Sequence, residues 1–270
     1  MVSEINKDLN EQVKEFRSRP LESEYPFLWI DALYEKVRVD GRVISIALMI
    51  AYGINSEGKR EILAVEPMYD ESEAYWREFF RKMKARGAEK ICLCISDAHL
   101  GIQNALKKEW IGCSWQRCKV HFMRNILARV PHREKALFAE RLKQIWLQPD
   151  KRTALLVAGS IIHDYEKRFP EAIKCLEEGL EDSLQFYEYP EIDKRRISST
   201  NVVERIIREI RRRSRVVGVF PNKASYVRLI TCYLIEYSEE WVNERSYIKQ
   251  ENIIISLETR ESHLETGAAC

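Results

Sequence analysis

A strongly apolar segment with β-sheet character contains a carboxylate near its middle. The segment runs from Phe27 to about Val39, and its aromatic and β-branched residues predict a buried strand. Because alternate residues of a strand share a face, Trp29, Asp31 and Leu33 should lie on one side. Burying a carboxylate is costly unless something compensates its charge. Asp31 is therefore at an exposed edge, paired with an arginine, or a metal ligand, and this strand alone leaves the three interpretations open.

Strand and helix signals alternate along the rest of the chain in a definite order. The expected strands are Phe27 to about Val39, Val43 to about Ile54, Glu61 to about Pro67, Lys90–Ser96 and Cys113–Trp115. The expected helices follow a cap at Asp70 with Glu73 in capping-box position, then cover Gly101–Trp110, several segments between 117 and 187, Val202–Arg213 and Lys223–Glu244. This βββαβα order, with a helical insertion after it, predicts an α/β fold: a ribonuclease-H-like mixed sheet with an all-helical insertion before the last catalytic helix.

The same signals predict how the chain is divided. Residues 1–20 should form a helical leader with no obvious core face, and residues 21–116 the first part of the ribonuclease-H-like catalytic core. Residues 117–190 should form the helical insertion, residues 191–250 the C-terminal helices that complete the core, and residues 251–270 a disordered tail.

Composition excludes several classes of protein. Hydrophobic residues make up 45% of the chain and charged residues 32%, as in an ordinary globular protein. We find no apolar run long enough to span a membrane and no signal-peptide core near the start. The seven cysteines are scattered without a secretory signal, which predicts reduced thiols and a cytoplasmic setting.

Positive charge is concentrated in one segment, although the net charge of the chain is only +2. Between Lys194 and Arg215 there are nine basic residues and two acidic ones, so this segment is +7 and the remainder of the chain is −5. Arginine concentrations of this kind are typical of phosphate binding. On the helix expected there, Arg208 and Arg211 follow Glu204 by about one and two turns, close to the same face. Such a helix could place a metal-binding carboxylate beside a DNA backbone, although a solvated basic face is the alternative.

Two more acids stand where catalytic carboxylates could be placed. Asp97 follows the buried strand Lys90–Ser96, and Glu204 lies in the first turn of the arginine-rich helix. Each has a structural alternative: Asp97 could cap the next helix, and Glu204 has capping-box spacing from Asn201. Together with Asp31 they could hold two Mg²⁺ ions, which prefer oxygen ligands and promote attack on a phosphodiester. We therefore expect the three carboxylates to converge within metal-bridging reach.

Five motifs, in order, resemble those of the bacterial Mutator-type insertion-sequence transposases, a family of DDE transposases. They are Trp29-Ile-Asp-Ala-Leu-Tyr-Glu-Lys-Val-Arg38, Ser96-Asp-Ala-His-Leu-Gly101, Trp115-Gln-Arg-Cys-Lys-Val-His-Phe-Met-Arg-Asn125, Ser199-Thr-Asn-Val-Val-Glu-Arg205 and Val217-Gly-Val-Phe-Pro-Asn222. The resemblance spans roughly residues 19–248.

The resemblance implies a function, cofactor, partners and site residues. It implies metal-dependent DNA strand cleavage and strand transfer, with Asp31, Asp97 and Glu204 as catalytic and metal-binding residues and Mg²⁺ or Mn²⁺, two ions, as cofactor. DNA would be the partner, at transposon ends and target, bound by a homodimer in a nucleoid-associated complex. The expected DNA-binding residues are Arg205, Arg208, Arg211, Arg212 and Arg215.

Two features leave alternatives open. Family members usually have a further N-terminal helical region that recognises terminal repeats, so the chain resembles a truncated copy, and the alternative function is a catalytically incompetent DNA-binding remnant. Cys118-x-x-His121, with Cys113 nearby, has too few ligands for a closed zinc site. The resemblance marks this pair as a family signature with a structural or strand-positioning role. Trp115 could stack on an unpaired base, or be a core residue.

Overall fold

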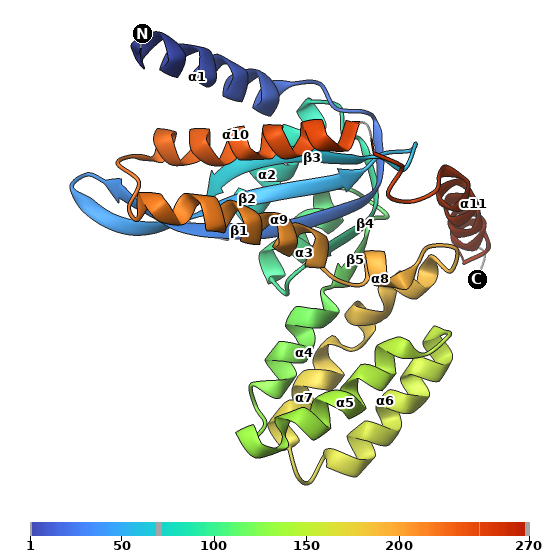
Figure 1. Ribbon diagram of the computed structural model, residues 1–270. Helices are drawn as coiled ribbons and strands as arrows, with labels where there is room; N and C mark the ends of the chain where they lie inside the picture. Colours follow the sequence, from blue (N-terminus) through green and yellow to red (C-terminus); the bar gives the residue numbers. More distant parts are fainter. Residues whose placement is uncertain (1, 69–71, 243, 268–270) are drawn as a thin grey trace.

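A five-stranded mixed sheet forms the centre of the molecule (Figure 1), which is a computed structural model that describes residues 2–68, 72–242 and 244–267. The strands are β1 (Glu24–Val39), β2 (Arg42–Ile54), β3 (Arg60–Met68), β4 (Lys90–Ser96) and β5 (Ser114–Arg117). Their order across the sheet is β3-β2-β1-β4-β5, with β1–β2 and β2–β3 antiparallel and β1–β4 and β4–β5 parallel. This confirms the predicted ribonuclease-H-like α/β fold.

The two longest strands, β1 and β2, form a hairpin that extends past the other strands (Figure 1). Asp40 and Gly41 turn it with φ angles of 48° and 78°, the left-handed conformation that an Asp-Gly pair adopts readily. The parallel pairing of β1 with β4 ends at Trp29 opposite Ile95. Beyond that point β1 continues its ladder with β2 and forms one isolated bridge, from Val37 to Phe220, and this is where Asp31 lies.

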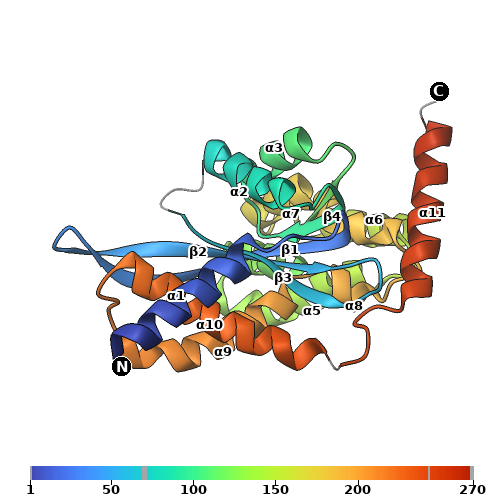
Figure 2. The same ribbon diagram turned by 90° about the horizontal axis from the view of Figure 1, so that it is seen from above.

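Two helices, α2 (Glu73–Ala85) and α3 (Leu100–Glu109), cover one face of the sheet (Figure 2). Their buried side chains pack against the face of β1 that contains Leu28 and Ile30. Ser72, whose side chain accepts a hydrogen bond from the Tyr75 amide, caps α2. The predicted cap, Asp70, lies outside the described residues.

The opposite face is covered by helices from both ends of the chain (Figure 2): α1 (Val2–Ser18), α9 (Asn201–Ser214) and α10 (Lys223–Val242), with the short turn η3 (Arg215–Val217) between the last two. Their apolar side chains join those of Trp29 and Leu33 in the larger core. The prediction that the leader has no core face is wrong, because Val13 of α1 is buried.

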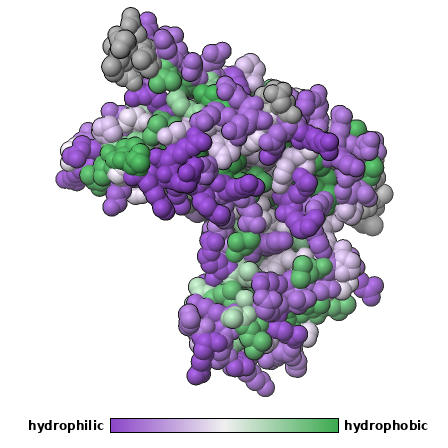
Figure 3. All heavy atoms as spheres, in the orientation of Figure 1, coloured by the Kyte–Doolittle hydropathy of each residue, from purple (hydrophilic) through white to green (hydrophobic). Residues whose placement is uncertain are grey.

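The helical insertion forms a second lobe, joined to the sheet by a narrower waist (Figures 1 and 3). Its elements are α4 (Lys119–Leu127), η1 (His132–Glu134), α5 (Lys135–Leu147), α6 (Lys151–Tyr165), α7 (Pro170–Gly179) and η2 (Glu181–Glu188), and α8 (Lys194–Ile197) leads back to the sheet. The breaks at Pro131, Pro149 and Pro170 agree with the prediction. Buried Gln116 ties β5 to this lobe: its side chain donates to the Ser183 carbonyl and accepts from the Phe186 amide.

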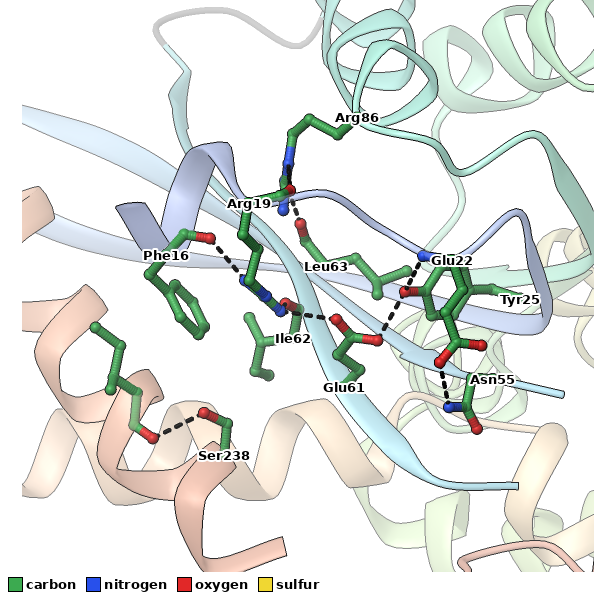
Figure 4. Close-up of polar contacts among 11 residues, drawn as sticks. Phe16, Arg19, Glu22, Tyr25, Asn55, Glu61, Ile62, Leu63, Arg86 and Ser238 are labelled. Atoms are coloured by element: carbon green, nitrogen blue, oxygen red, sulfur yellow. Dashed lines mark hydrogen bonds and ion pairs between the residues drawn. The ribbon is translucent and has the colours of Figure 1, made fainter. Parts of the chain in front are cut away.

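Arginines bind the backbone along the outer strand β3. Arg17, Arg19 and Arg86 donate to the carbonyl oxygens of Val65, Ile62 and Leu63, respectively. Figure 4 shows two of these guanidinium groups against the strand, with Arg19 also bound to Glu61. A sheet edge with free carbonyls is a template for unwanted strand pairing, and these side chains cover part of it.

The predicted disordered tail is wrong for the residues that the structure describes. Residues Gln250–Gly267 form helix α11, which buries Ile253. Arg260 donates hydrogen bonds to the Gly112 carbonyl and to the Ser114 hydroxyl, next to β5. These long-range contacts stabilise a segment in which sequence alone indicated no packing face.

Two expectations from composition agree with the described residues. None of the described helices combines the length and apolar character needed to cross a membrane. All six described cysteines are free thiols.

Candidate active site

Asp31 occupies the site where β1 leaves its parallel partner. The last ladder pair is Trp29 with Ile95, so Asp31 and Asp97 each follow this pair by two residues. The Asp31 carboxylate accepts a hydrogen bond of 2.8 Å from the Ala32 amide. Burial raises the pKa of Asp31 to about 6, and the negative charges of Glu204 and Asp97 add to the rise, while the Ala32 bond and His121 oppose it. The carboxylate is thus held close to two others.

Asp97 follows β4 and is about half exposed, with 53% of its side chain accessible. It accepts a hydrogen bond of 2.7 Å from the Ala98 amide. The helix that follows is capped by His99, whose Nδ1 accepts from the Gly101 amide. The alternative interpretation of Asp97 as a helix cap is therefore wrong, and its side chain is available at the end of the strand.

Glu204 projects from the first turn of α9. The N-cap residue of this helix is Thr200, and Asn201 is already helical, so the capping box expected between Asn201 and Glu204 does not form. Instead, one oxygen of Glu204 lies 3.1 Å from Nε2 of His121 and 3.4 Å from the Thr200 hydroxyl. The carboxylate is directed toward α4 rather than back along its own helix.

His121 lies between two of the acids. Its Nδ1 is 3.9 Å from Asp97 and its Nε2 is 3.1 Å from Glu204. A hydrogen bond with the Cys118 side chain raises the pKa of His121 to about 9 against the effect of burial, and the charges of Asp97 and Glu204 raise it further. These interactions favour the protonated imidazole, which supplies positive charge among the carboxylates.

Cys118 connects the segments that contain these residues. Its amide donates to the Ser96 carbonyl at the end of β4, and its sulfur accepts 3.3 Å hydrogen bonds from both the amide and the hydroxyl of Thr200. Burial alone would raise the pKa of the Cys118 thiol, but hydrogen bonds from His121 and Thr200 outweigh it and lower the pKa. Trp115 donates to the Ser96 hydroxyl at 2.8 Å and packs against the α2–α3 core, which favours a structural role for this tryptophan.

Two groups of residues at this site could bind a metal ion. Among the described residues, Cys118, His121 and Glu204 have ligand atoms within 4.8 Å of one another, and the three acids do not form so close a group. The Cys118 sulfur, however, is buried and already accepts two hydrogen bonds. A hard divalent ion prefers carboxylate oxygens, and Asp31 is partly buried, so that a cation would compensate its charge. The carboxylates therefore fit Mg²⁺ or Mn²⁺, although they converge less tightly than expected.

A basic hollow of about 470 Å³ lies beside the acids. Its lining includes Asp31, His121 and Glu204, together with the arginines Arg124, Arg208, Arg211 and Arg215. Residues 204, 208, 211 and 215 fall within about 60° around a helix at 100° per residue, whereas Arg205 and Arg212 lie about 80–100° away from Glu204. Accordingly these two do not line the hollow, and Arg212 is paired with Glu209.

Sequence reasoning missed two residues of this site. Arg124 lies three residues after His121 and thus on the same face of α4, a spacing that could have identified it. Tyr34 has no such signal, because it follows Asp31 by three residues and strand alternation assigns it to the opposite face. It nevertheless lines the basic hollow together with Asp31. The face of the molecule on which α9 lies is strongly hydrophilic (Figure 3).

Fold and site together define a class. A sheet of this order, with carboxylates where its two central strands diverge and a third on a helix packed across them, is a ribonuclease-H-like domain with an acidic site. The sequence pattern of the family described as "Transposase, Mutator family" matches residues 1–244. The chain belongs to the Mutator family of transposases.

Curated relatives agree with this family. The chain is 39% identical over 251 residues to the transposase for insertion sequence element IS256 in transposon Tn4001 of Staphylococcus aureus, covering 92% of this chain and 64% of the relative. It is 36% identical over 252 residues to the ISRM5 transposase of Rhizobium meliloti, with 93% and 63% covered, and 38% identical over 248 residues to the IS1081 transposase of Mycobacterium tuberculosis, with 92% and 60% covered. The chain thus spans less than two thirds of the length of these relatives.

Proposed function

We propose that this chain is the catalytic core of a DDE transposase, which cleaves DNA strands and joins a 3′-hydroxyl to target DNA. The observation that supports it best is the grouping of Asp31, Asp97 and Glu204 around His121. The acids come from β1, the end of β4 and α9, segments far apart in the chain. Family membership supports the same reaction class.

Different residues of the site would bind the metal ions and the phosphate groups. Asp31, Asp97 and Glu204 would hold two divalent ions, which activate the attacking oxygen and stabilise the leaving oxygen of a phosphodiester. The arginine face of α9 would hold the phosphate groups of the strand next to the acids. Because Glu204 and Arg211 share one helix face, the spacing between metal and phosphate sites is fixed by the helix itself.

The two chemical steps use the same site. In cleavage, a water oxygen attacks phosphorus, the P–O bond to the 3′-oxygen breaks, and that oxygen leaves with a proton as a 3′-hydroxyl. In strand transfer, this 3′-hydroxyl attacks a target phosphodiester, loses its proton, and displaces the target's own 3′-oxygen. Neither step changes an oxidation state, so the residues need only orient the reacting oxygens, compensate negative charge and prevent unproductive orientations of the substrate.

A cleavage and strand-transfer assay tests the proposal. The substrate is a labelled duplex from the DNA that flanks the gene, offered intact and with a pre-cut 3′-hydroxyl end, together with supercoiled plasmid as target and Mg²⁺ or Mn²⁺. We expect nicked and joined products from the wild-type chain and a loss of at least about 100-fold in Asp97→Asn, because charge stabilisation of this kind contributes on the order of 10²–10³.

The matched control is Asp164→Asn, which removes an exposed carboxylate from α6 in the helical lobe. We expect it to retain full activity. If Asp97→Asn cleaves as fast as the wild-type chain, the assignment of the acids is wrong. If the wild-type chain binds DNA but makes no metal-dependent product, even from pre-cut ends, the chain is a DNA-binding remnant and not a catalyst.

A further inference from the structure

A second hollow opens on the other side of Asp31. It has a volume of about 220 Å³, and its lining includes both Asp31 and Asp97. The basic hollow described above includes Asp31 and Glu204. Asp31, Ala32 and Tyr34 line both hollows. Asp31 therefore stands on a ridge between the two hollows, with Asp97 on one side and Glu204 on the other.

The walls of the second hollow combine apolar and aromatic side chains with polar ones. Besides the two aspartates, they consist of Ile30, Ala32, Tyr34, Met49, Trp76, Ser96, Ala98, His99 and Ile102. Neither lysine nor arginine is among these lining residues, whereas four arginines line the basic hollow. Apart from metal ions held by the two aspartates, a phosphate has no cationic partner among these lining side chains, whereas an uncharged ring can pack its π-face against the aromatic ones.

Three ring-bearing residues, Tyr34, Trp76 and His99, line this hollow. The rings of Trp76 and His99 lie with centroids 6.4 Å apart. The indole N–H of Trp76 is buried and has no hydrogen-bond partner among the described residues. Tyr34 is 45% exposed and lines both hollows. One exposed aromatic ring and one unsatisfied buried donor are thus found in the same small space.

We propose that this hollow takes one unstacked nucleobase of the strand whose phosphate lies at Asp31, and that Tyr34 is a positioning residue for it. The inference rests on the proposed function, since it needs DNA in the basic hollow. A base inside a duplex cannot enter the hollow, so the nucleotide beside the scissile phosphate must swing out of its stack. With the phosphate on the arginine side and the base on the aromatic side, the nucleotide spans the ridge and fixes its phosphorus over the acids.

Permanganate reactivity of thymine tests the inference, because it reports thymines that have left the base stack. The position of the cut is first mapped with the wild-type chain and Mg²⁺. Duplexes with a thymine at each position within three nucleotides of this cut are then bound to the Glu204→Gln protein. This substitution prevents cleavage and lies outside the second hollow. We expect one thymine position to become reactive on binding.

Variants of the hollow then locate the effect. In the Glu204→Gln background, Tyr34→Ala should abolish the reactive position, and Tyr34→Phe, which keeps the ring, should retain it. His99→Asn removes a ring but keeps an N-cap acceptor for α3, so the fold is preserved and the reactivity should fall. Tyr34→Ala should weaken binding of ordinary DNA by roughly 5- to 150-fold, and by much less when the reactive nucleotide is abasic.

The outcomes separate this inference from the proposed function. If the chain cleaves DNA but no thymine becomes reactive, or if Tyr34→Ala leaves the reactive position and the abasic preference unchanged, the base hollow is wrong and the transposase core stands. If the chain neither binds nor cleaves DNA, both proposals fall. A reactive thymine that disappears in Tyr34→Ala and persists in Tyr34→Phe supports the hollow.

Discussion

The charge of Asp31 should destabilise the fold in the absence of metal, and Asp31→Asn should relieve this. Burial and the neighbouring carboxylates raise the pKa of Asp31 from 3.8 to about 6. A rise of about two pKa units corresponds to about 3 kcal/mol, at roughly 1.36 kcal/mol per unit. Asn keeps the shape of the side chain and an oxygen that can accept the hydrogen bond from the Ala32 amide, so the substitution mainly removes the charge.

The sign of the pH dependence follows from the raised pKa. Well below pH 3.8 the carboxyl is protonated in both folded and unfolded chains, so its charge imposes no penalty. As the pH rises from 3.8 to about 6, the unfolded chain ionises while the folded chain stays protonated, and the folded chain loses stability relative to it. The wild-type chain should therefore lose up to about 3 kcal/mol relative to Asp31→Asn between pH 4 and pH 7, and the difference should stay constant above that.

Urea unfolding at a series of pH values, with a chelator present, measures this difference. The quantity to follow is the difference in the free energy of unfolding between the wild-type chain and the variant. Its change across the pH range is informative because any constant effect of the amide cancels. Excess Mg²⁺ should then stabilise the wild-type chain more than the variant, by about 2.7 kcal/mol at one hundred times the dissociation constant. A wild-type minus variant difference that does not change between pH 4 and pH 7 would refute the reasoning.

Three further substitutions test separate features. Arg211→Ala should reduce the slope of log affinity against log salt in DNA-binding titrations by about 1, and Arg212→Ala by less, since Arg212 is paired with Glu209. Gln116→Leu should cost about 2–5 kcal/mol in urea unfolding, because two buried backbone groups lose their partners. Trp29→Phe removes the indole bond to the Ser199 carbonyl and should lower the free energy of unfolding by about 1–3 kcal/mol; an unchanged value would show that this bond does not hold β1 to α9.

The fold could be predicted from sequence because its signals are local. Alternation, the Asp40-Gly41 turn and the continuous apolar run of β4 each depend on neighbouring residues, and the connection order then restricts the sheet. The same locality placed Asp31 on the first strand and Asp97 at the end of the strand Lys90–Ser96. Short stretches of the chain are therefore sufficient to predict the strands and the position of two of the acids.

Other features depend on contacts between distant segments and gave no local signal. Glu204 and His121 are 83 positions apart, so their 3.1 Å approach depends on how the helical lobe returns to the sheet. The helix α11 was predicted to be a disordered tail because the ends of chains are commonly poorly ordered. It is held instead by one buried isoleucine and by Arg260 next to β5.

The Cys-x-x-His motif acquires a physical explanation from its bonds. The Cys118 amide binds the end of β4, where Asp97 follows, and the Cys118 sulfur binds Thr200, four residues before Glu204. His121, one turn along α4, then meets both acids. The first turn of α4 therefore sets the distance between the carboxylates of Asp97 and Glu204, which lie more than a hundred residues apart in the sequence. Cys118, His121 and Glu204 offer only three ligands, too few for a closed structural zinc site, and we propose that Cys118 positions the acids and does not bind metal.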